Sequence, residues 1–146
     1  VVLKYYFHPI MKGSYSIKVV LPAVQNSSGF IKEKYSKPVY GTPDMPSANL
    51  SEPKVWIEYG PDGSVLSPYK LLPPVSSYLG IETDLDEREL NVTESIANGG
   101  AALAAYAKMQ FSDDTMSEAL KNALLTYCEL DTLAMVFIWE YFYHEC

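Results

Sequence analysis

Tyr127 and Asp131 are the residues whose types and spacing point most directly to chemistry. Residues four apart on a helix project from one face, about one turn from each other, so this spacing places a phenol hydroxyl near a carboxylate. The carboxylate would hold a divalent cation and the hydroxyl would orient a metal-bound water, as metal-assisted phosphodiester hydrolysis requires. The structural interpretation is that Tyr127 is a core aromatic and that Asp131 caps or favours the N-terminal end of the last helix.

A second group lies near the start of the chain. Ser14 or Ser16 is suited to cap a helix, and Lys12 and Lys18 stand close by. The free backbone N–H groups of such a helix start, with Ser16 and the two lysines, would receive a phosphate. The alternative is that the serine only caps the helix and that the lysines are solvated surface residues.

The elements that must position these residues are mainly helical. Residues 1–7 are typical of the last turns of a helix ended by Pro9, because proline cannot continue the hydrogen-bond ladder. The short helix capped by Ser14 or Ser16 is limited by Pro22. These features make residues 1–24 a helix followed by a capped short helix.

Residues 93–146 form the helical C-terminal part. Small residues after Gly99 predict a helix to about residue 109. An N-cap within residues 113–115 begins a second helix with apolar spacing to Tyr127. A last helix, roughly over residues 129–143, is apolar on most sides, so we expect it to be buried.

Residues 25–92 differ from both flanks because nearly all the prolines lie there, among glycine, serine and asparagine. Within this stretch, residues 54–59 and 64–70 flank a Gly-Pro-Asp-Gly turn, which is typical of a β-hairpin. We interpret it as an insertion packed by its aromatic residues. The expected fold class is therefore α+β and predominantly α, with a long proline- and aromatic-rich insertion that contains a hairpin.

Composition describes one globular domain. The chain has 146 residues, 48% of them hydrophobic and 20% charged, which excludes a disordered tail. No apolar run is long enough for a membrane helix, so we expect no membrane partner. The two cysteines, Cys128 and Cys146, are too few for a disulfide framework and favour the cytoplasm. The net charge of −7 combines +5 over residues 1–40 with −12 over the rest, and only the basic part suits a polyanion.

Four blocks of sequence occur in order along most of the chain. They are residues 13–22 (GSYSIKVVLP), 68–74 (PYKLLPP), 99–102 (GGAA) and 127–135 (YCELDTLAM). Together they resemble an uncharacterised bacterial family, the domain of unknown function numbered two-seven-seven-nine. That family is similar to the C-terminal part of ribonuclease H-like 3′–5′ exonucleases of the DEDD type, whose third motif is Tyr-x-x-x-Asp. Residues 16–18 also resemble the Ser-Leu-Lys helix start of related exonucleases.

The resemblance implies that Asp131 is a metal ligand and that Tyr127 orients the attacking water. In such enzymes an Asp-x-Glu strand and a second Asp precede the region that corresponds to Val1, and neither is present here. We therefore expect residues 1–146 to be a single domain and a fragment of a longer chain, the C-terminal portion of a ribonuclease H-like module. This chain alone would bind no metal and have no activity, since two metal ions need most of the carboxylates.

The full-length protein would then be an exonuclease-like hydrolase that uses Mg²⁺ or Mn²⁺ to cleave DNA or RNA. The same resemblance implies an upstream nuclease domain in that chain. The isolated fragment is expected to form a homodimer that covers surface left open by the missing part. The alternative of a different class is a non-catalytic interaction or structural domain of a larger nuclease-associated protein, whose aromatic insertion contacts a partner.

Overall fold

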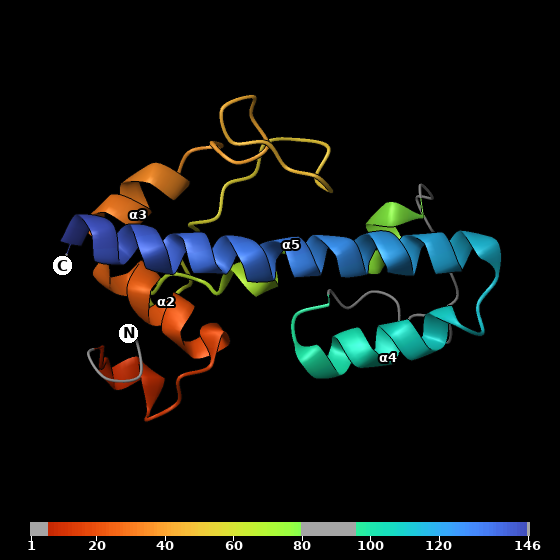
Figure 1. Ribbon diagram of the computed structural model, residues 1–146, viewed down its shortest axis with the longest axis horizontal. Helices are drawn as coiled ribbons and strands as arrows, with labels where there is room; N and C mark the ends of the chain where they lie inside the picture. The colour runs from red at the N-terminus through yellow and green to blue at the C-terminus, as the bar shows by residue number, and fades with distance from the viewer. Residues whose placement is uncertain (1–5, 80–95, 146) are drawn as a thin grey trace. The chain divides into compact units, whose positions relative to one another are not determined.

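The computed structural model describes residues 6–79 and 96–145, and these residues are predominantly helical, as the sequence predicts (Figure 1). The chain divides into two compact units. We call Val1–Pro68 with Asp131–Cys146 the terminal unit, and Tyr69–Leu130 the central unit. The helical elements are, in order, η1 (Pro9–Met11), α2 (Ile17–Ser27), α3 (Gly29–Tyr35), η2 (Pro68–Leu71), η3 (Val75–Tyr78), α4 (Gly99–Met109) and α5 (Asp114–Glu145).

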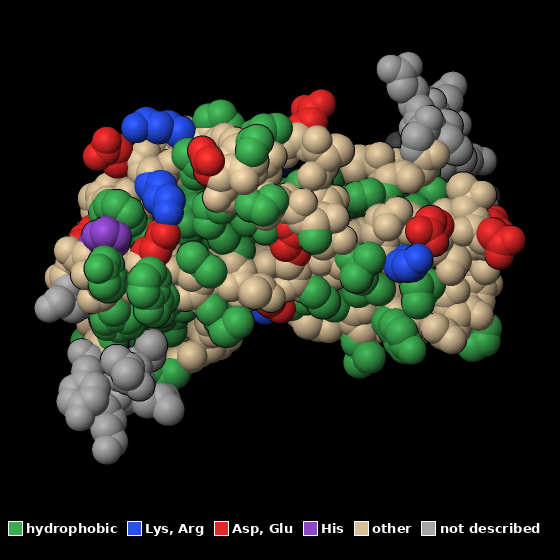
Figure 2. Space-filling view, turned by 45° about the horizontal axis from the view of Figure 1, so that its top comes forward, with side chains coloured by type: hydrophobic (Ala, Val, Ile, Leu, Met, Phe, Trp, Pro, Cys, Tyr) green, Lys and Arg blue, Asp and Glu red, His purple; other side chains and the backbone are tan. Residues whose placement is uncertain are grey.

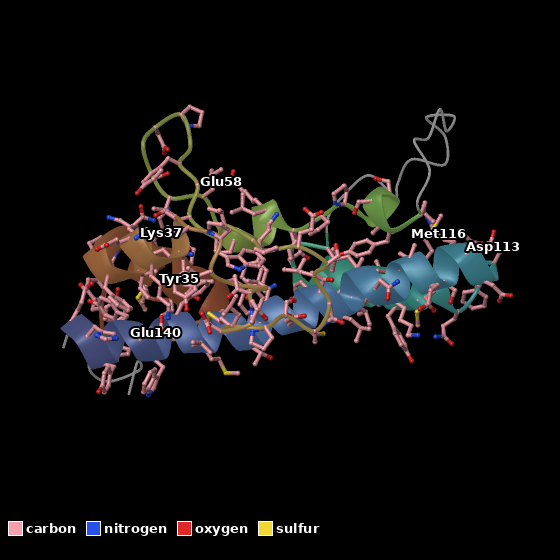
Figure 3. All side chains as sticks on the ribbon, turned by 90° about the horizontal axis from the view of Figure 1, so that it is seen from above. Tyr35, Lys37, Glu58, Asp113, Met116 and Glu140 are labelled. Carbon is pink, nitrogen blue, oxygen red and sulfur yellow. The ribbon has the colours of Figure 1, made fainter. Side chains whose placement is uncertain are left out.

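Helix α5 is one continuous helix of 32 residues, where the sequence predicts two helices that meet near residue 128. The predicted break is wrong because no glycine or proline interrupts residues 115–144, and nothing else there opposes the helical ladder. The N-cap predicted within residues 113–115 is Asp113, whose Oδ1 accepts a hydrogen bond from the Met116 N–H at 2.8 Å (Figure 3).

Helix α2 runs through Pro22 to Ser27, so the prediction that Pro22 limits this helix is wrong. A proline at this position removes one N–H from the ladder. The helix gains more by burying Val20, Leu21 and Val24, each at most 2% exposed. The predicted boundary between residues 24 and 25 consequently falls inside a helix.

The segment before η1 is also not helical where it is described. Tyr6 and Phe7 have no helical structure, and residues 1–5 of the predicted helix lie outside the described residues. His8 explains the change, because its Nδ1 accepts a hydrogen bond from the Ile10 N–H at 3.2 Å and caps η1. The capping side chain and Pro9 start a new turn here.

The proline-rich stretch contains α3 and a turn at the predicted hairpin. The Leu66 N–H donates to the Glu58 carbonyl and the Gly60 N–H to the Ser64 carbonyl, both at 2.8 Å. An isolated antiparallel bridge joins Tyr59 to Val65, and the described residues contain only isolated bridges of this kind. The chain thus doubles back at this turn without a ladder of paired strands. Residues 80–92 of the predicted insertion lie outside the described residues.

Most aromatic residues of this stretch belong to the core. Tyr35, Tyr40 and Trp56 are buried in the terminal unit, and Tyr69 is buried in the central unit. Among the described aromatic residues of this stretch, only Tyr59 is strongly exposed, at 58%. The aromatic side chains therefore hold this stretch against its own unit.

In the central unit, α4 has the boundaries that the sequence predicts. The Asn98 side chain accepts a hydrogen bond from the Ala101 N–H at 2.9 Å and caps the helix. The Tyr78 hydroxyl donates to Thr126 Oγ1 at 2.9 Å, which ties η3 to α5 within this unit. A capped glycine pair followed by alanines is a local signal, and the observed helix follows it.

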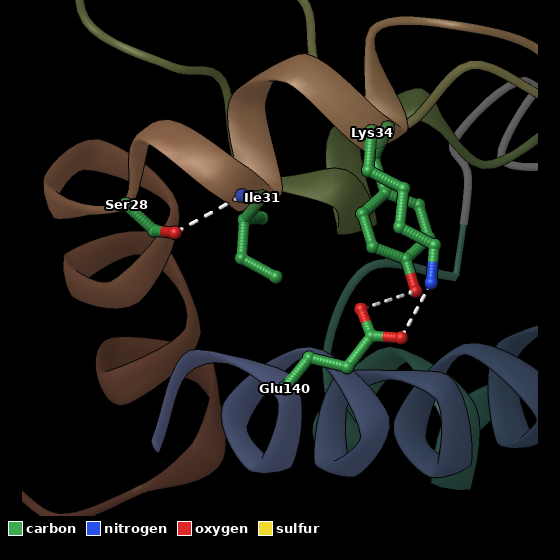
Figure 4. A network of polar contacts seen from close by, with 5 residues as sticks. Ser28, Ile31, Lys34 and Glu140 are labelled. Carbon is green, nitrogen blue, oxygen red and sulfur yellow. Dashed lines mark hydrogen bonds and ion pairs between the residues drawn. The ribbon is translucent and has the colours of Figure 1, made fainter. Parts of the chain in front are cut away.

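A buried polar network joins α3 to the C-terminal turns of α5 (Figure 4). Lys34 Nζ lies 2.5 Å from Glu140 Oε1, and the Tyr35 hydroxyl donates to Glu140 Oε2 at 3.0 Å. Figure 3 shows Tyr35 and Glu140 pointing toward one another from these two helices. Ser28 caps α3 through the Ile31 N–H at 3.0 Å. Because Glu140 is only 8% exposed, its charge depends on these partners.

Burial raises the pKa of the Tyr35 hydroxyl far above its ordinary value of 10.0, and the Glu140 charge and hydrogen bond raise it further. Below pH 10 the hydroxyl is protonated in both the folded and the unfolded chain. Above pH 10 only the unfolded chain releases this proton, so the free energy of unfolding should fall by up to about 1.4 kcal/mol per pH unit for this group. Urea titrations from pH 8 to 11 should show that the free energy of unfolding falls less steeply with pH in Tyr35→Phe than in the unchanged chain. Equal slopes for the two proteins would mean that Tyr35 does not cause the fall.

Gln25 on α2 is fully buried, and its Oε1 and Nε2 have no hydrogen-bond partner among the described residues. An unsatisfied buried amide costs about 1–3 kcal/mol. Gln25→Met keeps the length of the side chain and removes this cost, so urea unfolding should show a gain of about 1–2 kcal/mol. Gln110→Met, at an exposed position, should change stability by less than about 0.5 kcal/mol. A loss of stability in the Gln25 variant would mean that the amide is satisfied.

Candidate functional site

Tyr127 lies on α5 within the central unit and is 6% exposed. Its ring packs against Tyr69, with ring centroids 5.9 Å apart and planes at 51°. Next to it, the Thr126 hydroxyl donates to the Asn122 carbonyl at 2.9 Å. Tyr127 therefore has the aromatic packing role that its sequence position suggested, and any role of its hydroxyl adds to that packing.

Asp131 lies in the middle of α5 and is half-buried. It does not stand at a helix start, so the expectation that Asp131 caps or favours the N-terminal end of a last helix is wrong. The cause is the continuity of α5, which begins at Asp114. On an uninterrupted helix, positions 127 and 131 project from the same side, about one turn apart. The structure thus places both residues of the Tyr-x-x-x-Asp spacing on one helix.

The donor set for a metal is small. The described residues, 6–79 and 96–145, contain no group of three or more His, Cys, Asp or Glu side chains that could hold a metal ion. A magnesium site is built from oxygen ligands and usually keeps several waters, while a two-metal site needs several carboxylates. Asp131 fits such a site as one ligand, and the described residues do not complete it.

The three proposed phosphate ligands lie around the start of α2. Lys12 is exposed on a turn with a left-handed backbone, φ +48°, after η1. Ser16 holds the N-cap position, but its side chain makes no capping hydrogen bond, while its own N–H donates to Ser14 Oγ at 3.3 Å. Lys18 is half-buried in the first turn of α2. The sequence thus predicts the helix start correctly, but the Ser16 hydroxyl does not make the predicted cap.

An apolar groove in the terminal unit is the feature that the sequence does not reveal. It has a volume of about 440 Å³ between the start of α2 and the C-terminal turns of α5. Hydrophobic side chains gather around these turns of α5, toward the left in Figure 2. The groove is lined by Tyr15, Ile17, Val20, Met135, Ile138, Trp139 and Phe142.

The exposure of the groove corrects the expectation that the last helix is buried. Trp139 is 61% exposed and Met135 is 57% exposed. The Trp139 ring stacks on Tyr143, with centroids 5.1 Å apart and planes at 15°. The apolar character of α5 on most sides was the available signal, because α2 and α3 cover only some sides of its C-terminal turns.

Compared with known proteins, the chain matches no family model, no curated protein and no solved structure. The fold alone therefore gives its structural class, a predominantly helical chain with two compact units. Although α5 is long, neither it nor another helix among the described residues combines the length and apolar character of a membrane span.

Proposed function

We propose that this chain contributes Tyr127 and Asp131 to the site of a Mg²⁺- or Mn²⁺-dependent nuclease whose remaining carboxylates lie upstream in a longer protein. The observation that supports it is the position of both residues on the uninterrupted helix α5, with Asp131 away from any helix start. In this proposal the chain is the C-terminal portion of a ribonuclease H-like module, and residues 54–70 form its inserted hairpin.

Each residue has a definite task in such a site. Asp131 supplies one anionic oxygen ligand to the cation. The Tyr127 hydroxyl, one helical turn away, would orient the attacking water through a hydrogen bond. A bound cation polarises the phosphodiester and lowers the pKa of a bound water. Both side chains thus act by binding and orientation.

The start of α2 is the proposed contact for the nucleic-acid backbone. Lys12 is exposed, and the N-terminus of α2 follows it five residues along the chain. Lysine and helix N-termini are ordinary phosphate ligands, and they bind the backbone without reading sequence. DNA and RNA both carry this phosphate, so the proposal covers either substrate.

The test is degradation of a labelled single-stranded DNA and RNA by the full-length protein, with Mg²⁺ or Mn²⁺ and after chelation by EDTA. We expect activity with the metal and none after chelation, while this chain alone should be inactive. Activity of the full-length protein that is unaffected by EDTA would contradict the proposal.

A second candidate, a non-catalytic interaction domain, is favoured by the groove between α2 and α5. A contiguous exposed apolar surface is typical of a binding site for another protein. The surface differs from the one expected from the sequence, since the aromatic residues of the proline-rich stretch are mostly buried. In this candidate the α2–α5 face, and not that stretch, contacts the partner.

A further inference from the structure

The groove combines a hollow with protruding aromatic side chains. Ile17 and Val20 of α2 form one wall, and Met135 and Trp139 of α5 lie on the other. All seven lining residues are apolar or aromatic, so the groove offers no buried charge to a ligand. Hollow apolar surfaces of this kind accept bulky aliphatic or aromatic side chains.

The size of the face selects the kind of occupant. Tyr15, Trp139 and Tyr143 are exposed by 44%, 61% and 69%, which corresponds to roughly 250–450 Å² of aromatic surface when a whole aromatic side chain counts as about 150–250 Å². A stable interface between two globular proteins buries about 800 Å² on each partner. This aromatic surface is about half of such an area or less, which a single helix can cover.

The positive charge of Lys12 beside the groove indicates which charge the helix that binds there carries. Lys12 precedes Tyr15 by three residues, so their Cα atoms are at most about 11 Å apart, within reach of a lysine side chain. Lys12 is exposed and has no ion pair among the described residues. Its turn is held by the Lys12 N–H bond to Pro9 and the Ser14 N–H bond to the Met11 carbonyl. An exposed cation without an ion pair among the described residues favours a carboxylate on the partner.

Several other charges of this unit have partners on α2, α3 or α5. Lys34 pairs with Glu140, and Lys37 with Glu33. Lys32 Nζ donates to the Asn26 carbonyl at 2.7 Å. Glu145 accepts from Ser28 and from the Phe30 N–H of α3. Glu140 and Glu145 of α5 thus face α3, while Lys12 is an exposed charge close in sequence to Tyr15 at one end of the groove.

We propose that the groove between α2 and α5 binds an amphipathic helix of a partner protein, with bulky apolar side chains at i, i+4 and i+7 and a carboxylate placed beside Lys12. The inference rests on the second candidate function, and it is independent of Tyr127 and Asp131. We expect Trp139 to be the main contact, since it is 61% exposed and tryptophan often carries a large share of binding energy at an interface.

The experiment measures fluorescence anisotropy of a labelled 18-residue helical peptide with leucines at i, i+4, i+7 and i+11 and glutamates on its flanks. We expect saturable binding to the chain, about 10-fold or more weaker for Trp139→Ala and about 2- to 5-fold weaker for Lys12→Glu at low salt. Tyr106→Ala and Lys70→Glu change an exposed tyrosine and an exposed lysine of the central unit, and should leave binding unchanged.

Three comparisons separate this proposal from its competitors. The same peptide with lysines in place of glutamates should bind more weakly than the acidic one; equal or tighter binding would overturn the assignment of the partner's charge while the groove remained a binding surface. A single-stranded oligonucleotide should bind Trp139→Ala as tightly as the unchanged chain, because its proposed contact is Lys12; weaker binding to this variant would assign the groove to nucleic acid. In sedimentation, any dimer of the chain should persist in Trp139→Ala, because a dimer lost in this variant would assign the groove to a second copy. Absence of saturable peptide binding overturns the proposal, and none of these results depends on nuclease activity.

Discussion

Asp131→Asn should abolish nuclease activity of the full-length protein, with a loss of about 10³-fold or more in the rate of cleavage. Asparagine keeps the shape of the side chain and removes the charge that holds a divalent cation, so the helix should persist while the metal site fails. Activity is measured on labelled single-stranded DNA and RNA with Mg²⁺ and Mn²⁺. Circular dichroism and urea unfolding check that the variant is folded.

The Tyr127→Phe variant removes the hydroxyl and keeps the ring, so it separates the proposed role of the hydroxyl in orienting water from the packing of the ring. The ring contact with Tyr69 remains in this variant, so a loss of activity would come from the hydroxyl. We expect a loss of about 10- to 100-fold, smaller than that of Asp131→Asn. Glu118→Gln is the matched control on α5, since Glu118 is an exposed carboxylate that pairs with the exposed Lys121, and it should keep full activity.

A folded Asp131→Asn variant with normal cleavage would contradict the proposed nuclease site. The interaction domain would then be the better account of the chain, because the groove between α2 and α5 does not involve Asp131. If Asp131→Asn and Glu118→Gln lost activity equally, the effect would be a general one on α5. The comparison of these two variants therefore assigns the loss to the position of the carboxylate.

Local signals predicted the parts of the fold that local interactions decide. The start of α4 follows from a glycine pair and alanines, and the start of α5 from Asp113, whose side chain caps the first turn. The end of α2 was missed because Pro22 breaks a local rule, and burial of the neighbouring valine and leucine residues outweighs it. Propensity is a weak guide where tertiary packing is available.

In the candidate site, too, the local features were predictable from the sequence and the long-range contacts were not. The spacing of Tyr127 and Asp131 on one helix was predictable, since it needs only the helical period. The packing of Tyr127 against Tyr69 was not, because these residues are far apart in sequence and no pattern pairs them. The groove was missed for a related reason: apolar residues around a whole helix indicate burial, and only the placement of α2 and α3 decides which side stays open.

The pairing of Lys34 and Tyr35 with Glu140 is also a long-range feature, and it should control the stability of the terminal unit. Glu140 is nearly buried and accepts from both partners, one charged and one neutral. The Tyr35 ring, which is fully buried, packs edge-on against Phe137 of α5 with centroids 4.1 Å apart. Removal of the carboxylate leaves a buried hydroxyl without its acceptor and a half-buried ammonium without its counter-ion.

Glu140→Ala should therefore lower the free energy of unfolding by about 2–4 kcal/mol, measured by urea denaturation at neutral pH. Glu140→Gln keeps an acceptor for Tyr35 and loses only the charge, so its loss should be about half as large. Glu33→Ala removes an exposed carboxylate that pairs with Lys37 at 3.7 Å, and it should cost less than about 0.5 kcal/mol. Equal losses for Glu140→Ala and Glu33→Ala would mean that burial adds nothing to this pair, and α3 would then be held to α5 by its apolar contacts alone.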